Sequence, residues 1–164
     1  MCEFDVAQTC NIALQLETDL REDFVECTYL LSSDVAMVSP LVDHLMRLIN
    51  GLRVVDGAEV EIEVALREAL LNAIIHGNRE DPHKHVYLTI LCGADGEVST
   101  VIRDEGAGFD IGAVPDPTAP EHRMSTHGRG IYLMRALMDE VSFEEGGAVV
   151  YMRKGTTSRS YRSQ

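Results

Sequence analysis

The segment Glu68-Ala69-Leu70-Leu71-Asn72 is the first of three that decide the fold of this 164-residue chain. The second is Asp104-Glu105-Gly106-Ala107-Gly108-Phe109, and the third is His127-Gly128-Arg129-Gly130-Ile131. They supply, in turn, a carboxylate and a carboxamide one helical turn apart, an acid before a glycine turn, and two glycines that open an apolar helix. Their order and spacing predict a nucleotide site far more strongly than any one segment alone.

The first segment lies in a helix expected over about residues 58–76. At about 100° per residue its apolar side chains form a stripe that would pack on a sheet, and Glu68 and Asn72 lie about 40° apart on its flank. Asparagine is a poor helix-interior residue because its amide competes for backbone hydrogen bonds. An oxygen ligand for Mg²⁺ would explain Asn72, since this ion prefers oxygen and bridges substrate phosphates. Glu68 could then polarise a hydroxyl nucleophile. Taken alone, the pair is more often a solvated glutamate and a structural asparagine.

The second segment follows a predicted strand. Glycines at alternate positions, Gly106 and Gly108, let the backbone approach a flat ligand without obstruction by Cβ atoms. The carboxylate of Asp104 could accept a hydrogen bond from the exocyclic amine of adenine, and Phe109 could cover the base. The alternative is a tight surface turn. A calcium loop is disfavoured because further acidic ligands are missing at the expected spacing.

The third segment opens a helix expected over about residues 130–140. Free backbone N–H groups at a helix start can cradle phosphate oxygens, which assigns that role to Gly128 and Gly130. Arg129 either adds positive charge or faces solvent. The segment matches neither the P-loop nor the dinucleotide-binding pattern.

The remaining elements are predicted by apolar periodicity and turn residues. They comprise a strand over 25–31, a helix from Ser33 or Asp34 to Asn50-Gly51, a hairpin over 86–92 and 98–103, and a closing hairpin over 141–145 and 148–153. Residues 106–127 are rich in glycine, proline and polar residues, and long loops of this kind are usually functional. Residues 1–24 carry only weak helical signals and form an extension of unassigned role. Residues 155–164 are expected to be a flexible tail.

Composition narrows the function classes. The chain has 27 acidic and 14 basic side chains and a net charge of -13, which disfavours direct nucleic-acid binding because that needs a basic surface. The four cysteines lack metal-site spacing and fit a reduced compartment. No leader pattern and no apolar run of about 18 residues is present, so we expect a cytoplasmic protein that does not enter a membrane.

In this order the three segments resemble the Bergerat ATP-binding fold of the GHKL superfamily. The longer phrases over 68–78, 104–109 and 128–141 resemble the RsbW and SpoIIAB anti-sigma-factor serine kinases, and the resemblance covers about residues 25–154. It implies an α+β, two-layer sandwich with a mixed, mostly antiparallel sheet and three main helices on one face. MgATP would lie between the helices and a lid over about 110–127.

The resemblance also implies roles for individual residues. Glu68 would be the general base, Asn72 the magnesium ligand and Asp104 the adenine anchor. The nucleotide-contacting turns would comprise Gly106, Gly108, Gly128 and Gly130, and Phe109 and Arg129 are added to the nucleotide-binding set from the reasoning on their own segments. In such kinases the acceptor is a serine on a STAS-type anti-anti-sigma partner, and the unphosphorylated partner releases a bound sigma factor. The related kinases commonly form homodimers.

Two departures concern phosphate handling. The final hairpin carries Gly147-Ala148 where the family often has Gly-Thr, and the lid carries Met124-Ser125-Thr126-His127 where an acid and an arginine are common. The leading interpretation is a protein serine/threonine kinase that controls a sigma factor. The alternative is a nucleotide-gated binding module without catalysis. A histidine kinase is disfavoured because no dimerisation helix pair with a phosphoacceptor histidine is evident, and a gyrase-type ATPase would need further domains.

Overall fold

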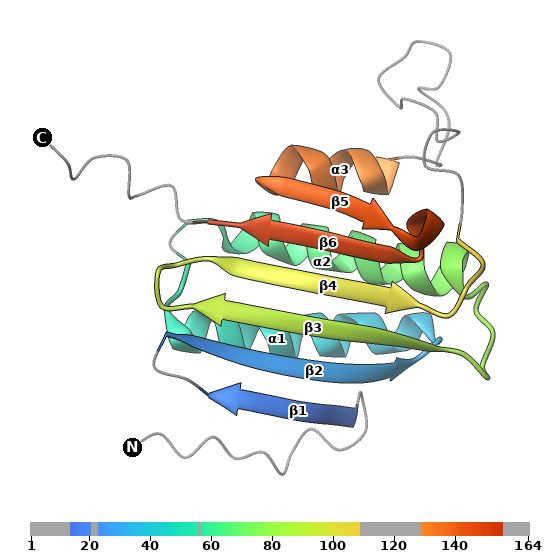
Figure 1. Ribbon diagram of the computed structural model, residues 1–164, viewed down its shortest axis with the longest axis horizontal. Coiled ribbons are helices and arrows are strands. Elements are labelled where there is room, and N and C mark those ends of the chain that lie inside the picture. The colour runs from blue at the N-terminus through green and yellow to red at the C-terminus, as the bar shows by residue number, and fades with distance from the viewer. Residues whose placement is uncertain (1–13, 21–22, 56, 109–128, 156–164) are drawn as a thin grey trace, which may run out of the picture.

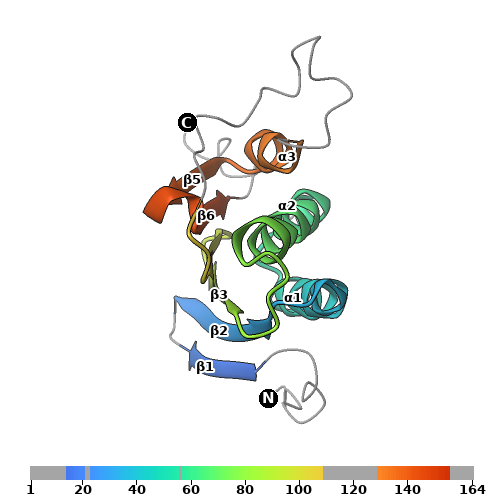
Figure 2. The same ribbon diagram turned by 90° about the vertical axis from the view of Figure 1, so that its right-hand side faces the viewer.

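The computed structural model describes residues 14–20, 23–55, 57–108 and 129–155, which form two layers. One layer is a six-stranded sheet in the order β1-β2-β3-β4-β6-β5, as Figure 1 shows. The other layer consists of helices α1, α2 and α3, which all lie on the same face of the sheet (Figure 2). The α+β sandwich expected from the sequence is therefore confirmed.

The elements follow one another closely along the chain. The strands are β1 (Leu14–Leu20), β2 (Phe24–Ser32), β3 (His85–Gly93), β4 (Val98–Asp104), β5 (Glu140–Glu144) and β6 (Val149–Lys154). The helices are α1 (Val38–Leu52), α2 (Glu59–Leu71) and α3 (Arg129–Leu137), with short turns of helix at Val35–Met37, Asn72–Gly77 and Glu145–Gly147. The expected strand at 25–31, both hairpins and all three helices are present.

The sheet differs from the expected mixed one in that every strand pairing among the described residues is antiparallel. β4 and β5 run in the same direction and are connected through α3. They do not pair, because β6 returns between them and forms antiparallel ladders with both. The helical crossover thus joins parallel strands that are second neighbours, and no parallel ladder forms.

β1 is an element that the sequence did not predict. It pairs with β2 from Leu14↔Leu30 to Leu20↔Val25, with an irregular register between Gln15 and Glu17. This strand lies within residues 1–24, so part of that extension belongs to the sheet.

The core lies between the sheet and the helices. Side chains of β4 alternate, and Val98, Thr100, Ile102 and Asp104 are buried toward the helix layer. α2 buries Ile62, Leu66 and Leu70 against the core. Because Asp104 continues the inward-facing series of β4, the last residue of the strand places a carboxylate at the end of the core, beside α2.

Candidate functional site

Two polar side chains of α2 and the turn that follows it converge on the start of α3. A Cβ atom placed on Gly130 would lie 2.6 Å from Oε2 of Glu68, 3.1 Å from Nδ2 of Asn72 and 3.4 Å from its Oδ1. Residues about one third of the chain apart therefore meet, as the resemblance to the Bergerat fold implies. Any side chain at position 130 would occupy the space that the carboxylate and the carboxamide share.

The Asn72 side chain carries an unexplained polar group. Its Nδ2 atom is buried and has no hydrogen-bond partner among the described residues. Buried polar atoms are almost always hydrogen-bonded, so an orphaned one calls for a specific explanation. A ligand that reaches the carboxamide would supply it. The oxygen of the same amide fits Mg²⁺, which usually takes one or two protein oxygens together with waters and substrate phosphates.

A magnesium ion here would depend on the nucleotide for most of its ligands. Among the described residues, no group of three or more His, Cys, Asp or Glu side chains is placed to hold a metal ion. A single carboxamide beside a helix start, where free N–H groups could bind phosphate, fits a metal that would arrive with its substrate.

Asp104 provides a buried carboxylate that is held on one side. Its N–H donates to the carbonyl of Ala148 at 3.0 Å, and its Oδ1 accepts a hydrogen bond from the N–H of Gly106 at 2.8 Å. Its Oδ2 accepts no hydrogen bond from the part of the chain that the structure describes. Burial raises the pKa of Asp104, while the Gly106 N–H and the charge of Lys84 oppose that rise. The carboxylate is thus oriented and has one oxygen left for a ligand.

Glycines allow the helix layer and the Asp104 turn to touch. α2 continues into a π-helical turn, Asn72–Gly77, a rare geometry that is frequent at functional sites. A Cβ atom on Gly77 would overlap the carboxylate of Asp104, and one on Gly106 would overlap the carbonyl of Gly77. Gly108 has a φ of 74°, and a Cβ atom there would overlap the carbonyl of Gly146. Gly106 and Gly108 are therefore required by close approach of the chain to its own backbone, whereas the sequence-based expectation was approach to a flat ligand.

A small cavity lies between Asn72 and Asp104. Its walls combine these two polar residues with small and apolar ones from α2, β4, α3 and the closing hairpin. They comprise Ala69, Asn72, Ala73, Ile102, Asp104, Met134, Phe143, Gly147, Ala148 and Val150. Apolar walls with a few convergent polar groups are typical of sites for flat ligands. The volume is about 20 Å³, about that of one water molecule, which is too small for a nucleotide base.

A larger groove of about 650 Å³ lies over the outward face of the sheet. It is lined by outward-facing residues such as Thr28, Thr89 and Val101, and it contains neither Glu68 nor Asn72. The two hollows share Asp104 and Ala148. Of the two, only the small cavity brings Asn72 and Asp104 together.

The remaining predicted site residues lie in different places, and some lie outside the described part of the chain. Arg129 is exposed at the first position of α3. Phe109 and Gly128 lie outside the described residues, as does the expected lid over 110–127. Asn78, by contrast, takes no part in the sequence-based site except as a helix stop, yet it is completely buried. An asparagine after a helix-ending glycine is typical of a helix cap, so the sequence does not indicate that this side chain is buried.

The comparisons with known proteins agree with this geometry. A family described as "Histidine kinase-like ATPase domain" matches residues 31–154. The chain belongs to the histidine kinase-like ATPase domain family. Membership of this family implies that the domain binds ATP. Among the described residues, α1, α2 and α3 are all too short or too polar to cross a membrane.

Several relatives of this ATPase domain are named "Anti-sigma F factor". The protein from Geobacillus thermodenitrificans is 34% identical over 141 residues, which cover 82% of this chain and 84% of the relative. The protein from Priestia megaterium is 31% identical over 145 residues, with 84% and 86% covered. The protein from Shouchella clausii is 30% identical over 160 residues, with 93% and 96% covered. The resemblance to RsbW- and SpoIIAB-type anti-sigma factors is therefore confirmed.

Asp104→Asn is expected to raise the melting temperature of the ATP-free protein at neutral pH by a few degrees, since about 1 kcal/mol corresponds to about 2–4 °C in a domain of this size. Burial raises the pKa of Asp104 above its ordinary value, so folding disfavours the charged carboxylate. The wild-type protein is therefore destabilised above the folded-state pKa and regains that stability as the pH falls through it. Asparagine keeps an oxygen for the Gly106 N–H.

Melting curves from neutral pH down to about pH 4, near the ordinary pKa of an aspartate, with and without MgATP, check this result. The stability gain should shrink toward the acidic end, and ATP should stabilise only the wild-type protein. Asp95→Asn is the matched control, because exposed Asp95 accepts the same kind of hydrogen bond from the N–H two residues ahead, that of Glu97. A lower melting temperature for Asp104→Asn at neutral pH would contradict the assigned burial cost.

Proposed function

We propose that this protein is a cytoplasmic, Mg²⁺-dependent serine/threonine kinase and anti-sigma factor. It phosphorylates a serine or threonine of a STAS-type anti-anti-sigma partner and thereby controls the sequestration of a sigma factor. The observation that carries the proposal is the convergence of Glu68 and Asn72 on the bare backbone of Gly130, beside the buried carboxylate of Asp104. The names of the anti-sigma F factor relatives support the sigma-factor part.

Phosphoryl transfer depends mainly on positioning and on charge neutralisation, so a small site suffices. Asp104 orients the base through its free Oδ2. The N–H groups at the start of α3 face the phosphates, where the positive end of the helix dipole also acts. Asn72 would hold Mg²⁺, which neutralises phosphate charge when bound.

Glu68 acts on the acceptor. The acceptor hydroxyl oxygen forms a bond to the γ-phosphorus, its proton passes to the carboxylate of Glu68, and the bond to the ADP oxygen breaks. A general base must lie within hydrogen-bond reach of that proton. The proximity of Glu68 to the phosphate-facing start of α3 supports this assignment.

The test uses the full chain, γ-labelled ATP and a purified STAS-domain protein. Label is expected on a serine or threonine of the STAS protein, only when Mg²⁺ is present and not after chelation. Capture of a sigma factor, with release by unlabelled STAS protein, checks the anti-sigma part. Nucleotide-dependent capture without any labelled partner would overturn the kinase and favour the non-catalytic binding module.

A further inference from the structure

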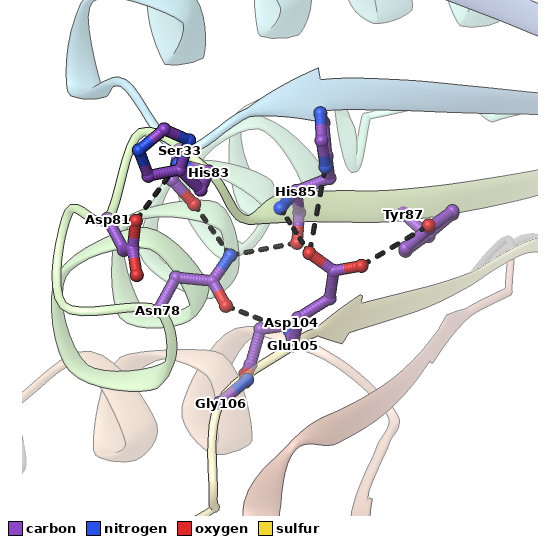
Figure 3. Close-up of polar contacts among 9 residues, drawn as sticks. All are labelled: Ser33, Asn78, Asp81, His83, His85, Tyr87, Asp104, Glu105 and Gly106. Carbon is purple, nitrogen blue, oxygen red and sulfur yellow. Dashed lines mark hydrogen bonds and ion pairs between the residues drawn. The ribbon is translucent and has the colours of Figure 1, made fainter.

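The side chain of Asn78 joins three segments that are distant in sequence, as Figure 3 shows. Its Nδ2 donates to Oγ of Ser33 at 2.6 Å and to the carbonyl of His85 at 2.8 Å. Its Oδ1 accepts from the N–H of Glu105 at 2.8 Å. The residue is completely buried, so water cannot replace any of these partners. Only a carboxamide offers both the donors and the acceptor in this space.

One of these bonds acts on the backbone next to the base anchor. Glu105 follows Asp104 directly, and its N–H is held by Asn78, while the N–H of Asp104 is held by Ala148 from the other side. The Glu105 carboxylate accepts from the N–H of His85 at 2.7 Å and lies 3.4 Å from the hydroxyl of Tyr87 (Figure 3). The backbone N–H groups on both sides of the Asp104 Cα atom, its own and that of Glu105, are therefore held by hydrogen bonds.

The backbone of Asn78 connects the same point to the helix layer. Its N–H donates to the carbonyl of Ala73 at 2.8 Å and closes the π-helical turn after α2. The next two residues, Arg79 and Glu80, have φ values of 58° and 55°, a left-handed conformation that such residues rarely adopt and that surrounding contacts must hold. Asn78 thus links the helix end that carries Asn72 to the turn that carries Asp104.

We propose that Asn78 is a positioning residue, which fixes the direction of the Asp104 carboxylate and thereby sets the preference of the site for adenine over guanine. The proposal rests on the role of Asp104 as base anchor. An adenine presents an amine donor to a carboxylate, whereas guanine presents a carbonyl acceptor at the corresponding ring position. A misdirected carboxylate loses the hydrogen bond from the adenine amine. It also repels the guanine carbonyl less strongly, so the site discriminates less against guanine.

The experiment measures the affinities of the full chain for MgATP and MgGTP by calorimetry. For Asn78→Ala we expect the ratio of ATP to GTP affinity to fall about tenfold, the order of one misplaced charge-assisted hydrogen bond. Asn78→Asp keeps an acceptor for the Glu105 N–H but has no donor for the His85 carbonyl, so a smaller fall is expected. If Asn78→Ala does not fold, Asn78→Asp alone carries the test.

Thr100→Val is the matched control. Thr100 is also a buried polar residue of β4, and its hydroxyl has no hydrogen-bond partner among the described residues. We expect its replacement to leave the affinity ratio unchanged. A parent-like ratio in a folded Asn78 variant would overturn the positioning role, because a purely structural residue would alter stability without altering base preference. Failure of the wild-type chain to bind ATP would instead overturn the site assignment itself.

Discussion

Glu68→Gln is expected to retain wild-type affinity for MgATP and to lower phosphoryl transfer to the STAS partner by about a hundred- to ten-thousand-fold, the usual contribution of a general base. Glutamine has nearly the same shape as glutamate and fills the same space beside Gly130, but its amide cannot take up the proton of the acceptor hydroxyl. Single-turnover transfer of labelled phosphate, measured together with calorimetry, separates the two effects.

The neighbouring carboxamide should behave in the opposite way. Asn72→Ala is expected to weaken the binding of MgATP more than that of metal-free ATP, because it removes the oxygen assigned to the metal. Glu61→Gln is the control for Glu68→Gln, since it makes the same chemical change in the first turn of α2. Equal transfer rates for Glu68→Gln and the parent would remove the assigned base.

Gly130→Ala is expected to lower phosphoryl transfer by about a hundredfold or more, the cost of displacing catalytic groups by about 1 Å. The new Cβ atom would lie 2.6 Å from Oε2 of Glu68 and 3.1 Å from Nδ2 of Asn72, so both side chains must move away from the start of α3. Their atoms near the new Cβ are the ends of side chains, which can swing aside. Alanine also favours a helix over glycine by about 1 kcal/mol.

The melting temperature of Gly130→Ala should therefore equal or exceed that of the parent, while the transfer rate falls. This combination distinguishes an obstructed site from a damaged fold. Gly155→Ala serves as the control, because a Cβ atom there would meet only Oδ2 of Asp139, at an ordinary contact distance of 3.7 Å. Unchanged transfer by Gly130→Ala would show that the space beside Glu68 is not part of the site.

Much of this architecture could be predicted from local pattern. The hairpin of β3 and β4 follows from alternating apolar residues around a glycine-containing turn, and α2 follows from its apolar stripe. Periodicity alone could not predict the convergence of Glu68, Asn72 and Gly130. It was implied by the resemblance to a known ATP-binding fold, and the structure places these residues together.

Other features depend on contacts that no local pattern encodes. β1 alternates Leu14 and Leu16 with Gln15 and Glu17, a strand signal, but it becomes a strand only by pairing with β2. α1 starts at Val38 rather than at Asp34, because Asp34 caps a separate short turn through a hydrogen bond to the N–H of Ala36. The expected stop at Asn50-Gly51 lies inside α1, which ends at left-handed Arg53.

The burial of Asn78 and its hydrogen bonds also depend on contacts that no local pattern encodes. Its partners come from the end of β2, the start of β3 and the residue after β4. Only the assembled sheet brings those three points together, so sequence reasoning that proceeds element by element could not find it. The orphaned amide of Asn72 is likewise visible only once its surroundings are packed.

The contact between Gly77 and the Asp104 turn has an evolutionary consequence. Any larger residue at Gly77 or Gly106 would collide with main-chain or carboxylate atoms even with no nucleotide present. Selection for folding alone would therefore preserve these glycines, whereas Glu68 would be free to drift in a descendant that no longer needed the proposed phosphorylation. A descendant that had become a pseudoenzyme would keep both glycines. Replacement of Glu68 in α2 would then be the change that marks the loss of catalysis.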